Sequence, residues 1–177
     1  MTDESRVVDD TAYHEARVLL LIDAACQAPG SNGVLNGLTK LAKMDFLVRY
    51  PHVVGRVIDD AVDIPAADDD PAVIDDPMIR YKYGPWDDRY YDVLGRLLSR
   101  GLVTATKGQR GALKFKSTHA GHETAGELAS RSEWNTVMQA CTRIASLTST
   151  MTGNQLKNMI YERLPDLMDR SHREVIA

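Results

Sequence analysis

The histidines and cysteines are the residues of this chain best suited to metal binding or catalysis. His119 and His122 are three positions apart and Glu123 follows them, so this segment contains side chains of the kind that zinc binds. A helical metal motif also needs a distant third ligand, and this segment is expected to end a strand and begin a helix. Neither Cys26 nor Cys141 has a second cysteine nearby. We therefore predict no metal site, exposed histidines, and cysteines that are buried free thiols.

Acid–base and nucleophilic catalysis also lack a recognisable arrangement. A cysteine and a histidine would have to meet through the fold, because no local signature of a nucleophile is present. The segment Gly30-Ser31-Asn32-Gly33 has neither the lysine nor the preceding strand of a phosphate-binding loop. Neighbouring carboxylates occur mainly in the stretch 57–77, which is a poor scaffold for tuning a pKa. The sequence thus predicts a protein that is not an enzyme, with no catalytic residue and no cofactor.

Charge is unevenly distributed along the chain, whose formal net charge is −4. The stretch 57–77 contains eight aspartates and no lysine or arginine, whereas 80–116 contains nine basic residues against three acidic ones. Contacts with phosphates need clustered positive charge, so the basic segment is compatible with nucleic-acid binding. The residues that we predict to contact nucleic acid are Arg80, Lys82, Arg89, Lys107, Gln109, Arg110, Lys114 and Lys116.

Aromatic side chains are interleaved with these basic residues. Rings in such a setting stack on bases or line a protein interface. Trp86 and Tyr90 are expected to fill the space between a strand and the helix that follows it. The remaining rings, Tyr81, Tyr83 and Tyr91, are predicted to bind a partner.

The elements that position these residues are expected to be mainly helical. Apolar spacing predicts helices over 11–28 and 35–50, and Pro51 is placed to open a short third helix over 52–58. A strand over 78–83 is expected before an amphipathic helix over 86–100, which Gly101 should cap. Strands over 102–106 and 112–117 form a hairpin around the turn 107–111. Helices over 134–147 and 153–164 follow, and the residues before 11 and after 165 are expected to be loose.

This order of elements predicts a mainly α fold with a small β-hairpin wing, that is, a winged helix-turn-helix with additional N- and C-terminal helices. The winged-helix domain is expected over 11–130, with 57–77 inserted as an acidic mobile loop, and a C-terminal helical extension over 131–165. An alternative role for the acidic stretch is to cover a basic surface until a partner displaces it.

No membrane segment is expected. The longest apolar runs are far shorter than the roughly 20 residues that a membrane-spanning helix needs. The first five residues are Met-Thr-Asp-Glu-Ser, which lack the basic and apolar regions of a signal peptide. We therefore expect a cytoplasmic protein.

Three segments give the chain a resemblance to a known family. The runs 38–47, 81–91 and 153–165 resemble the winged-helix middle component of bacterial three-component defence systems of the Lamassu kind, which contain an SMC-like or ABC-type ATPase. The similarity extends over 17–165. The resemblance implies a non-catalytic subunit that binds the ATPase, belongs with an effector subunit, and also contacts double-stranded DNA through the wing. The apolar and aromatic surface of the terminal helices would then add Trp134, Met138, Met159 and Tyr161 to the partner-binding residues.

Two other functions fit the same pattern. One is a stand-alone dimeric winged-helix transcription regulator, which would place 35–50 or 86–100 in the major groove and form a homodimer through its terminal helices. The other is an antitoxin-like partner-binding module that never contacts DNA, because the Tyr83-Gly84-Pro85 element is shared with Panacea-type antitoxin domains.

Overall fold

A computed structural model gives the fold of the chain. It describes residues 4–59, 78–81, 84–168 and 171–176, so nearly all of the predicted acidic loop lies outside the described residues. The prediction of a mainly helical protein with a small antiparallel sheet is confirmed. Among the described residues, no helix combines the length and the apolar character that a bilayer crossing requires.

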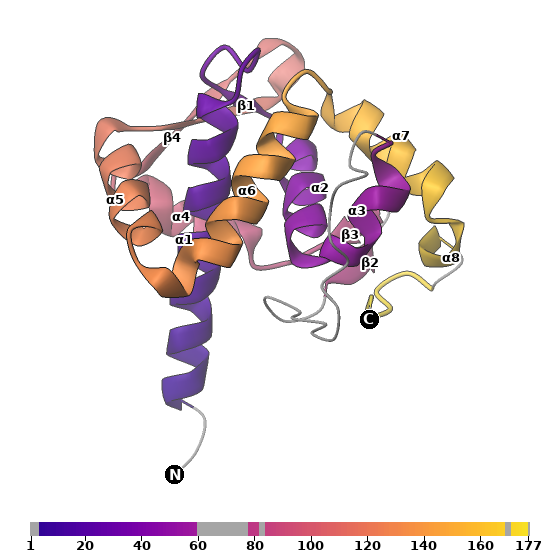
Figure 1. Cartoon of the computed structure of the whole chain (residues 1–177), viewed down its shortest axis with the longest axis horizontal. Coiled ribbons are helices and arrows are strands. Elements are labelled where there is room, and N and C mark those ends of the chain that lie inside the picture. The colour runs from indigo at the N-terminus through magenta and orange to yellow at the C-terminus, as the bar shows by residue number, and fades with distance from the viewer. Residues whose placement is uncertain (1–3, 60–77, 82–83, 169–170, 177) are drawn as a thin grey trace.

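The helix α2 (Leu38–Arg49) is the centre of the molecule. It packs against α1 (Glu4–Gln27), α6 (Asn135–Thr148), α7 (Gly153–Arg163) and the strand β3 (Gly84–Trp86) (Figure 1). Every residue from Lys40 to Arg49 is buried as a result. The spacing of apolar residues predicts one buried face for this helix. The structure also buries its charged side chains, because neighbours surround the helix on all sides.

The helix α1 begins at Glu4, earlier than predicted, and its first turns extend beyond the other elements (Figure 1). The short helix α3 (Pro51–Val57) follows α2, and Pro51 takes the first helical position as expected. Both cysteines are buried and free, which confirms that prediction.

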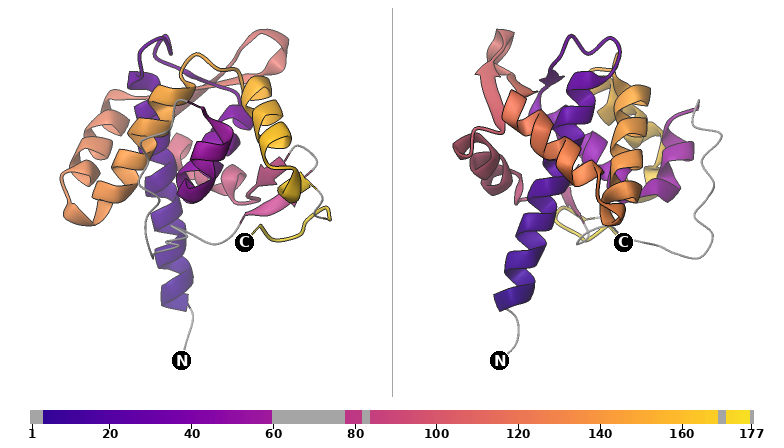
Figure 2. Two further views of the ribbon diagram at one scale, coloured as in Figure 1. Left: turned by 45° about the vertical axis from the view of Figure 1, so that its right-hand side comes forward. Right: turned by 60° about the vertical axis from the view of Figure 1, so that its left-hand side comes forward.

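The main sheet has three strands in the order β1-β5-β4. Its strands are β1 (Leu35–Asn36), β4 (Val103–Lys107) and β5 (Leu113–Ser117), and both pairings are antiparallel. The predicted hairpin is therefore confirmed, with the short 3₁₀ helix η1 (Gln109–Gly111) in its turn. Figure 2 shows the hairpin projecting from the helical body. Phe115, which is buried, anchors the hairpin at its centre.

The strongest predicted helix begins four residues later than its pattern indicates. α4 covers Tyr90–Ser99, whereas Gly84–Trp86 forms β3 and pairs with β2 (Ile79–Tyr81) in a separate two-stranded sheet. Gly84 has a φ of 95°, which a residue without a side chain adopts without strain. Asp87 then accepts a hydrogen bond from the backbone N–H of Arg89 at 2.9 Å, and this turn delays the start of the helix. The end was predicted correctly, since Gly101 follows the last helical residue with a φ of 69°.

The helix α5 (His119–Ala129) is joined to the hairpin through Thr118 and Gly121, which stand in a Thr-x-x-Gly spacing. Thr118 caps the helix, because its Oγ1 accepts a hydrogen bond from the backbone N–H of Gly121 at 3.0 Å. A Cβ atom at Gly121 would meet the carbonyl oxygen of Leu102 at 1.9 Å. The spacing therefore has two structural causes: Thr118 caps the helix, and the backbone of Gly121 lies close to that of Leu102.

We expect the substitution Gly121→Ala to lower the free energy of unfolding by at least about 2 kcal/mol, because the backbone of Leu102 must shift to admit the methyl group. Gly126→Ala on the same helix is the matched control. No atom lies within 4 Å of its added Cβ, so it should be neutral or stabilise the protein by about 1 kcal/mol. Urea denaturation of both variants measures the difference. Equal stabilities would contradict the close approach of α5 to Leu102.

The C-terminal helices belong to the same hydrophobic core as the rest of the chain. α6 follows the 3₁₀ turn η2 (Ser132–Trp134), and α7 begins with a capping box between Thr152 and Gln155. α8 (Pro165–Met168) restarts a helix at the proline that was expected to end one. Buried side chains from α6 and α7 pack in one cluster with those of α1 and α2. The two helices α6 and α7 thus share one hydrophobic core with α1 and α2.

The C-terminal tail is also anchored, contrary to the expectation of a loose end. Ile176 is buried, and its backbone N–H donates to the carbonyl oxygen of Met78 at 2.8 Å. The hydroxyl of Tyr50 joins the same two segments. It donates to the carbonyl oxygen of Ile176 at 2.6 Å and accepts from the N–H of Met78 at 2.9 Å.

Candidate macromolecule-binding surfaces

The β4–β5 hairpin, which was predicted to be a wing and is called the wing hereafter, is a basic surface of the described part of the chain. Lys114 and Lys116 face Thr106 and Thr104 across the strand pair, so all four side chains share the exposed side of the hairpin. Phe115 points to the opposite, buried side. This alternation follows directly from the two-residue period of a strand.

The tip of the wing adds further polar groups. Lys107, Gln109 and Arg110 are exposed, and Arg110 has a φ of 61°, in the left-handed region. No acidic residue occurs between 101 and 122, and none of the four wing cations forms an ion pair with a described residue. The wing therefore presents positive charge that is not neutralised locally. Five of the predicted nucleic-acid contacts lie together here: Lys107, Gln109, Arg110, Lys114 and Lys116.

Of the other three predicted contacts, only Arg89 has a described side chain, and it does not lie in this surface. Arg89 is held by Asp87, whose carboxylate accepts from its Nε at 3.0 Å and from its Nη2 at 2.8 Å. Its charge is therefore compensated inside the protein. Lys82 lies outside the described residues, and only the backbone of Arg80, in β2, is described.

Arg89 belongs to a buried charge network that sequence reasoning missed. Asp45 accepts from Arg17 Nε at 2.8 Å and from the hydroxyl of Tyr90 at 2.7 Å, and its other charged neighbour, Arg49, lies 3.6 Å away. Arg49 also donates to Asp87 at 2.8 Å. The network thus joins α1, α2 and the start of α4. A pair of opposite charges at positions i and i+4 of a helix whose apolar spacing predicts burial, Asp45 with Arg49, is the sequence signal that marks it.

The carboxylates of this network are held in their charged form. Burial alone would raise the pKa of Asp45, but the positive charges of Arg17 and Arg49 outweigh it and hold the pKa well below its usual range. The pKa of Asp87 is likewise lowered against the effect of burial, by hydrogen bonds from Arg89 and Arg49. These groups are paired with one another, so removing one partner of a pair should destabilise the fold.

His14 lies beside this network and is neutral. Burial and then the positive charge of Arg17 lower its pKa from 6.5 to about 4. Neither ring nitrogen has a hydrogen-bond partner among the described residues, and the ring meets that of Tyr90 edge-on at 5.8 Å.

The two other conspicuous histidines make ordinary surface contacts. His119 Nε2 lies 3.3 Å from Glu123, and both side chains are exposed. His122 Nδ1 lies 3.0 Å from an oxygen of Asp23, which also accepts a hydrogen bond from Ser117 at 2.7 Å. Within the described part of the chain, no group of histidine, cysteine and acidic side chains is arranged to hold a metal ion. The contact with Asp23 instead links α5 to α1.

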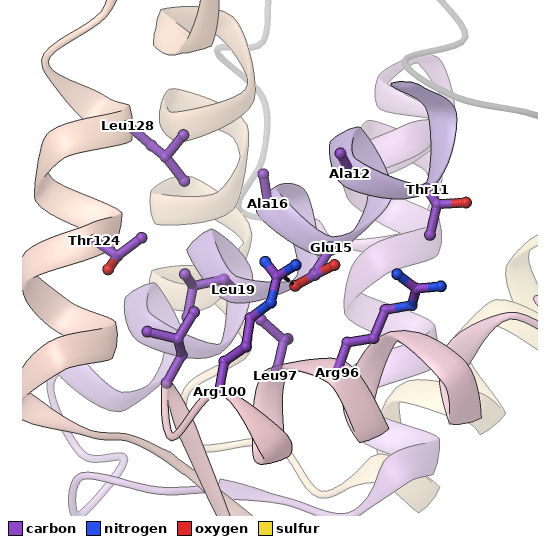
Figure 3. Close-up of a pocket in the computed structure, with 11 residues that line it drawn as sticks. Thr11, Ala12, Glu15, Ala16, Leu19, Arg96, Leu97, Arg100, Thr124 and Leu128 are labelled. Atoms are coloured by element: carbon purple, nitrogen blue, oxygen red, sulfur yellow. Dashed lines mark ion pairs between the residues drawn. The ribbon is translucent and has the colours of Figure 1, made fainter. Parts of the chain in front are cut away.

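The helix α4 offers little to a DNA groove. Figure 3 shows Arg96 and Arg100 extending from α4 toward α1, where they line a cavity of about 450 Å³ between α1, α4 and α5. Arg100 is bound there to the carboxylate of Glu15 at 2.8 Å. The rest of the exposed face of α4 carries one acidic residue and no basic one, and consists of Tyr91, Asp92, Gly95, Leu98 and Ser99.

The predicted partner-binding residues are dispersed, and some are buried. Tyr91 is 68% exposed, which makes it the best placed of them. Trp134 is only 9% exposed and stacks on Tyr13 with ring centroids 4.9 Å apart, so it belongs to the core. Met138 lines a shallow groove on α6, and Met159 and Tyr161 are half-buried on α7. Tyr83 lies outside the described residues, and only the backbone of Tyr81 is described.

The three segments that carry the family resemblance form one unit in space. Residues 38–47 belong to α2, 84–91 to β3 and the start of α4, and 153–163 to α7. α2 packs against both β3 and α7, and β3 also contacts α7. Comparisons of the chain with protein-family models, with curated proteins and with solved structures found no match.

Proposed function

We propose that this chain is a non-catalytic winged-helix subunit that contacts the DNA backbone through its wing and attaches to the ATPase of a three-component defence complex. The order of the elements supports the fold assignment. A short strand, β1, follows the first helix and completes a sheet with β4 and β5, which follow α4; the resulting order β1-β5-β4 is that of a winged helix. α3 and the β2–β3 hairpin are additions between the second and third helices.

The observation that carries the DNA-binding proposal is the uncompensated charge of the wing. Lys107, Arg110, Lys114 and Lys116 are exposed and project from the body, with no acidic neighbour in the hairpin (Figure 2). A surface of this kind attracts phosphates in any sequence, and its affinity falls steeply with salt because binding releases counterions.

The same geometry favours an accessory subunit over a stand-alone regulator. One of the two helices considered for the major groove, α2, is buried from Lys40 to Arg49, and only its first turn is accessible. The other, α4, has one basic residue, Arg96, which lines the cavity beside α1 together with Arg100 just beyond the helix; the rest of its exposed face carries no basic residue. Reading of base edges normally uses arginine, lysine, asparagine or glutamine from such a helix. We therefore expect weak binding without sequence preference.

The proposed protein partner is supported by the sequence resemblance together with the packing of α2, β3 and α7 into one unit. Tyr91, with 68% of its side chain exposed, lies beside this unit at the start of α4. Exposed tyrosines are enriched among residues that dominate protein interfaces. We propose that the ATPase binds on this side, away from the wing.

The wing proposal is tested with the triple variant Lys107→Ala, Arg110→Ala, Lys114→Ala. We expect DNA affinity to fall by about tenfold or more, and the slope of log K against log salt to decrease by up to about 2.7, since each lost phosphate contact removes about 0.9. Fluorescence anisotropy with a labelled duplex at several salt concentrations measures both quantities.

The matched control removes the same charge elsewhere, by Arg56→Ala, Arg131→Ala and Arg143→Ala. These residues lie outside the wing, and the only ion pair recorded for them in the described part of the chain is Arg56 with Asp166, which is exposed and worth little. The control should change the slope much less than the wing variant. Equal effects of the two variants would show that DNA binding depends on overall charge. If neither variant changed the binding, the wing would not be a DNA-binding surface.

The partner proposal is tested by co-expression with the product of a neighbouring ATPase gene, followed by gel filtration. A middle component should elute with the ATPase. A stable homodimer that binds one operator sequence tightly would establish the regulator instead. A complex with a partner and no DNA affinity in either form would establish the antitoxin-like module.

A further inference from the structure

A second cavity, of about 410 Å³, lies between α2, the β3–α4 junction and the C-terminal tail. Its wall contains Leu38, Thr39 and Lys43 from α2, Trp86 and Tyr91 from either side of the β3–α4 junction, and Arg173 from the tail. This volume is in the usual range of small-molecule sites.

Lys43 is the feature that sets this cavity apart. Its side chain is only 1% exposed, and its Nζ donates one hydrogen bond, to the carbonyl oxygen of Pro85 at 2.9 Å. No carboxylate is paired with it among the described residues, and the positive charge of Lys157 acts on it instead. A buried ammonium group without a counter-ion is costly, so it either loses its proton or binds an anion. Among the described residues, two of its three N–H donors have no acceptor.

The surroundings of Lys43 show that both states are accessible near neutral pH. Burial and then the charge of Lys157 lower its pKa from 10.5 to about 7. Gly84 packs closely against the ammonium group, since a Cβ atom there would lie 3.4 Å from Nζ and 3.3 Å from the ring of Tyr161. An anion that entered the cavity would meet an ammonium group that is partly protonated near neutral pH. No carboxylate among the described residues is paired with this group.

Aromatic rings form the outer part of the cavity. The rings of Trp86 and Tyr91 have centroids 6.1 Å apart and are tilted by 53° to each other. At the rim, Arg173 is bound to Asp88 at 2.8 Å. The charged lining residues are thus two cations and one carboxylate, which leaves a single net positive charge for a ligand to neutralise.

We propose that this cavity binds a small aromatic carboxylic acid, with the carboxylate on Lys43 and the ring against Trp86 and Tyr91. The single net charge fits a monoanion better than a phosphate dianion. The apolar rings and Leu38 fit a flat hydrocarbon body. The direct acceptor of Lys43, the carbonyl of Pro85, would be retained while the ligand takes the two unused N–H donors.

The experiment is isothermal titration calorimetry of the full chain with indole-3-acetate as the probe and its uncharged methyl ester as the matched compound. We expect the acid to bind at least about tenfold more tightly than the ester at pH 6.5, a difference of about 1.4 kcal/mol. Lys43→Met should abolish that difference while leaving the thermal transition in place, since methionine fits the apolar environment of the stem. Tyr91→Ala, at an exposed position, should weaken both compounds.

The pH dependence separates a carboxylate bound to Lys43 from one bound elsewhere. Binding requires the protonated amine, so affinity for the acid should fall by about tenfold per pH unit above pH 7. The other charged or titratable groups near Lys43 are Lys157 and Tyr161 of α7, with Asp88 and Arg173 at the rim. Lys43→Arg keeps its charge at high pH and should remove the decline.

Several outcomes would overturn the proposal. No binding of the acid at about 1 mM would do so, since weaker affinities are below those of a built site. Equal affinity for acid and ester, an unchanged affinity in Lys43→Met, or tighter binding of phenyl phosphate than of the carboxylate would each do the same. Met138→Ala, which alters a separate groove on α6, is the control variant and should bind the acid as the natural chain does.

Discussion

Replacing Asp45 by alanine should lower the free energy of unfolding by about 3–5 kcal/mol, the largest effect that we expect from a single substitution. The carboxylate is completely buried and bound by Arg17 at 2.8 Å and by Tyr90 at 2.7 Å. Its removal leaves Arg17 as a buried charge that has lost this carboxylate and Tyr90 as a buried hydroxyl that has lost its acceptor. Urea denaturation followed by circular dichroism measures the loss.

Asp92→Ala provides the control for this result, because Asp92 is an exposed aspartate on α4. Its substitution should change stability by no more than about 0.5 kcal/mol. Asp45→Asn keeps the shape of the side chain and removes only the charge, so it should also destabilise the protein strongly. If Asp45→Ala proved as mild as Asp92→Ala, the buried network would contribute little to the fold.

The stability of the protein should decrease by up to about 3 kcal/mol as the pH falls from 6.5 to 4. His14 has a pKa of about 4 in the folded chain and 6.5 in an exposed setting. Between these values the unfolded chain binds a proton at His14 and the folded chain does not, so acid favours unfolding. The contribution is complete above pH 6.5 and is lost through this window. Asp45 and Asp87, whose pKa values are lowered, add a further loss only below about pH 4.

The variant His14→Phe isolates this contribution. Phenylalanine retains the edge-on contact with Tyr90 and cannot take up a proton. Its unfolding free energy should therefore depend much less on pH between 6.5 and 4 than that of the natural chain, as measured by urea denaturation at several pH values. His119→Gln, at an exposed site, should leave the dependence unchanged. If the unfolding free energy of His14→Phe kept the same dependence on pH, other titratable groups would be responsible for that dependence.

The local structure of the wing was predictable because its determinants are close in sequence. The alternation of residues in β4 and β5, the glycines of the turn and the Thr118–Gly121 spacing each act within a few positions. The exposure of the basic side chains of β5 follows from the same alternation, once Phe115 is taken as the buried residue. The basic segment as a whole was less well predicted, because Arg89 is bound to Asp87.

The start of α4 and the surroundings of α2 were not predictable from local patterns. Trp86 has the spacing of a helical residue, but it pairs with Ile79 in a strand. The pairing depends on the segment 79–81 and on the close approach of Gly84 to Lys43. The spacing of apolar residues along the chain contains no information on either contact. Trp134 presents the same difficulty, because its burial depends on stacking against Tyr13 in the first helix.

The sequence by itself determined that the chain is mainly helical, that a short basic hairpin follows an amphipathic helix, and that Gly101 and Thr118 limit the helices on either side of it. Only the tertiary structure decided that α2 is buried from Lys40 to Arg49, that Asp45 binds side chains of α1 and α4, and that Lys43 is buried with no carboxylate paired to it among the described residues. The physical reason is that propensities and caps act between neighbours in the chain. Burial and charge pairing depend instead on which distant segments meet, as when Arg17 reaches Asp45.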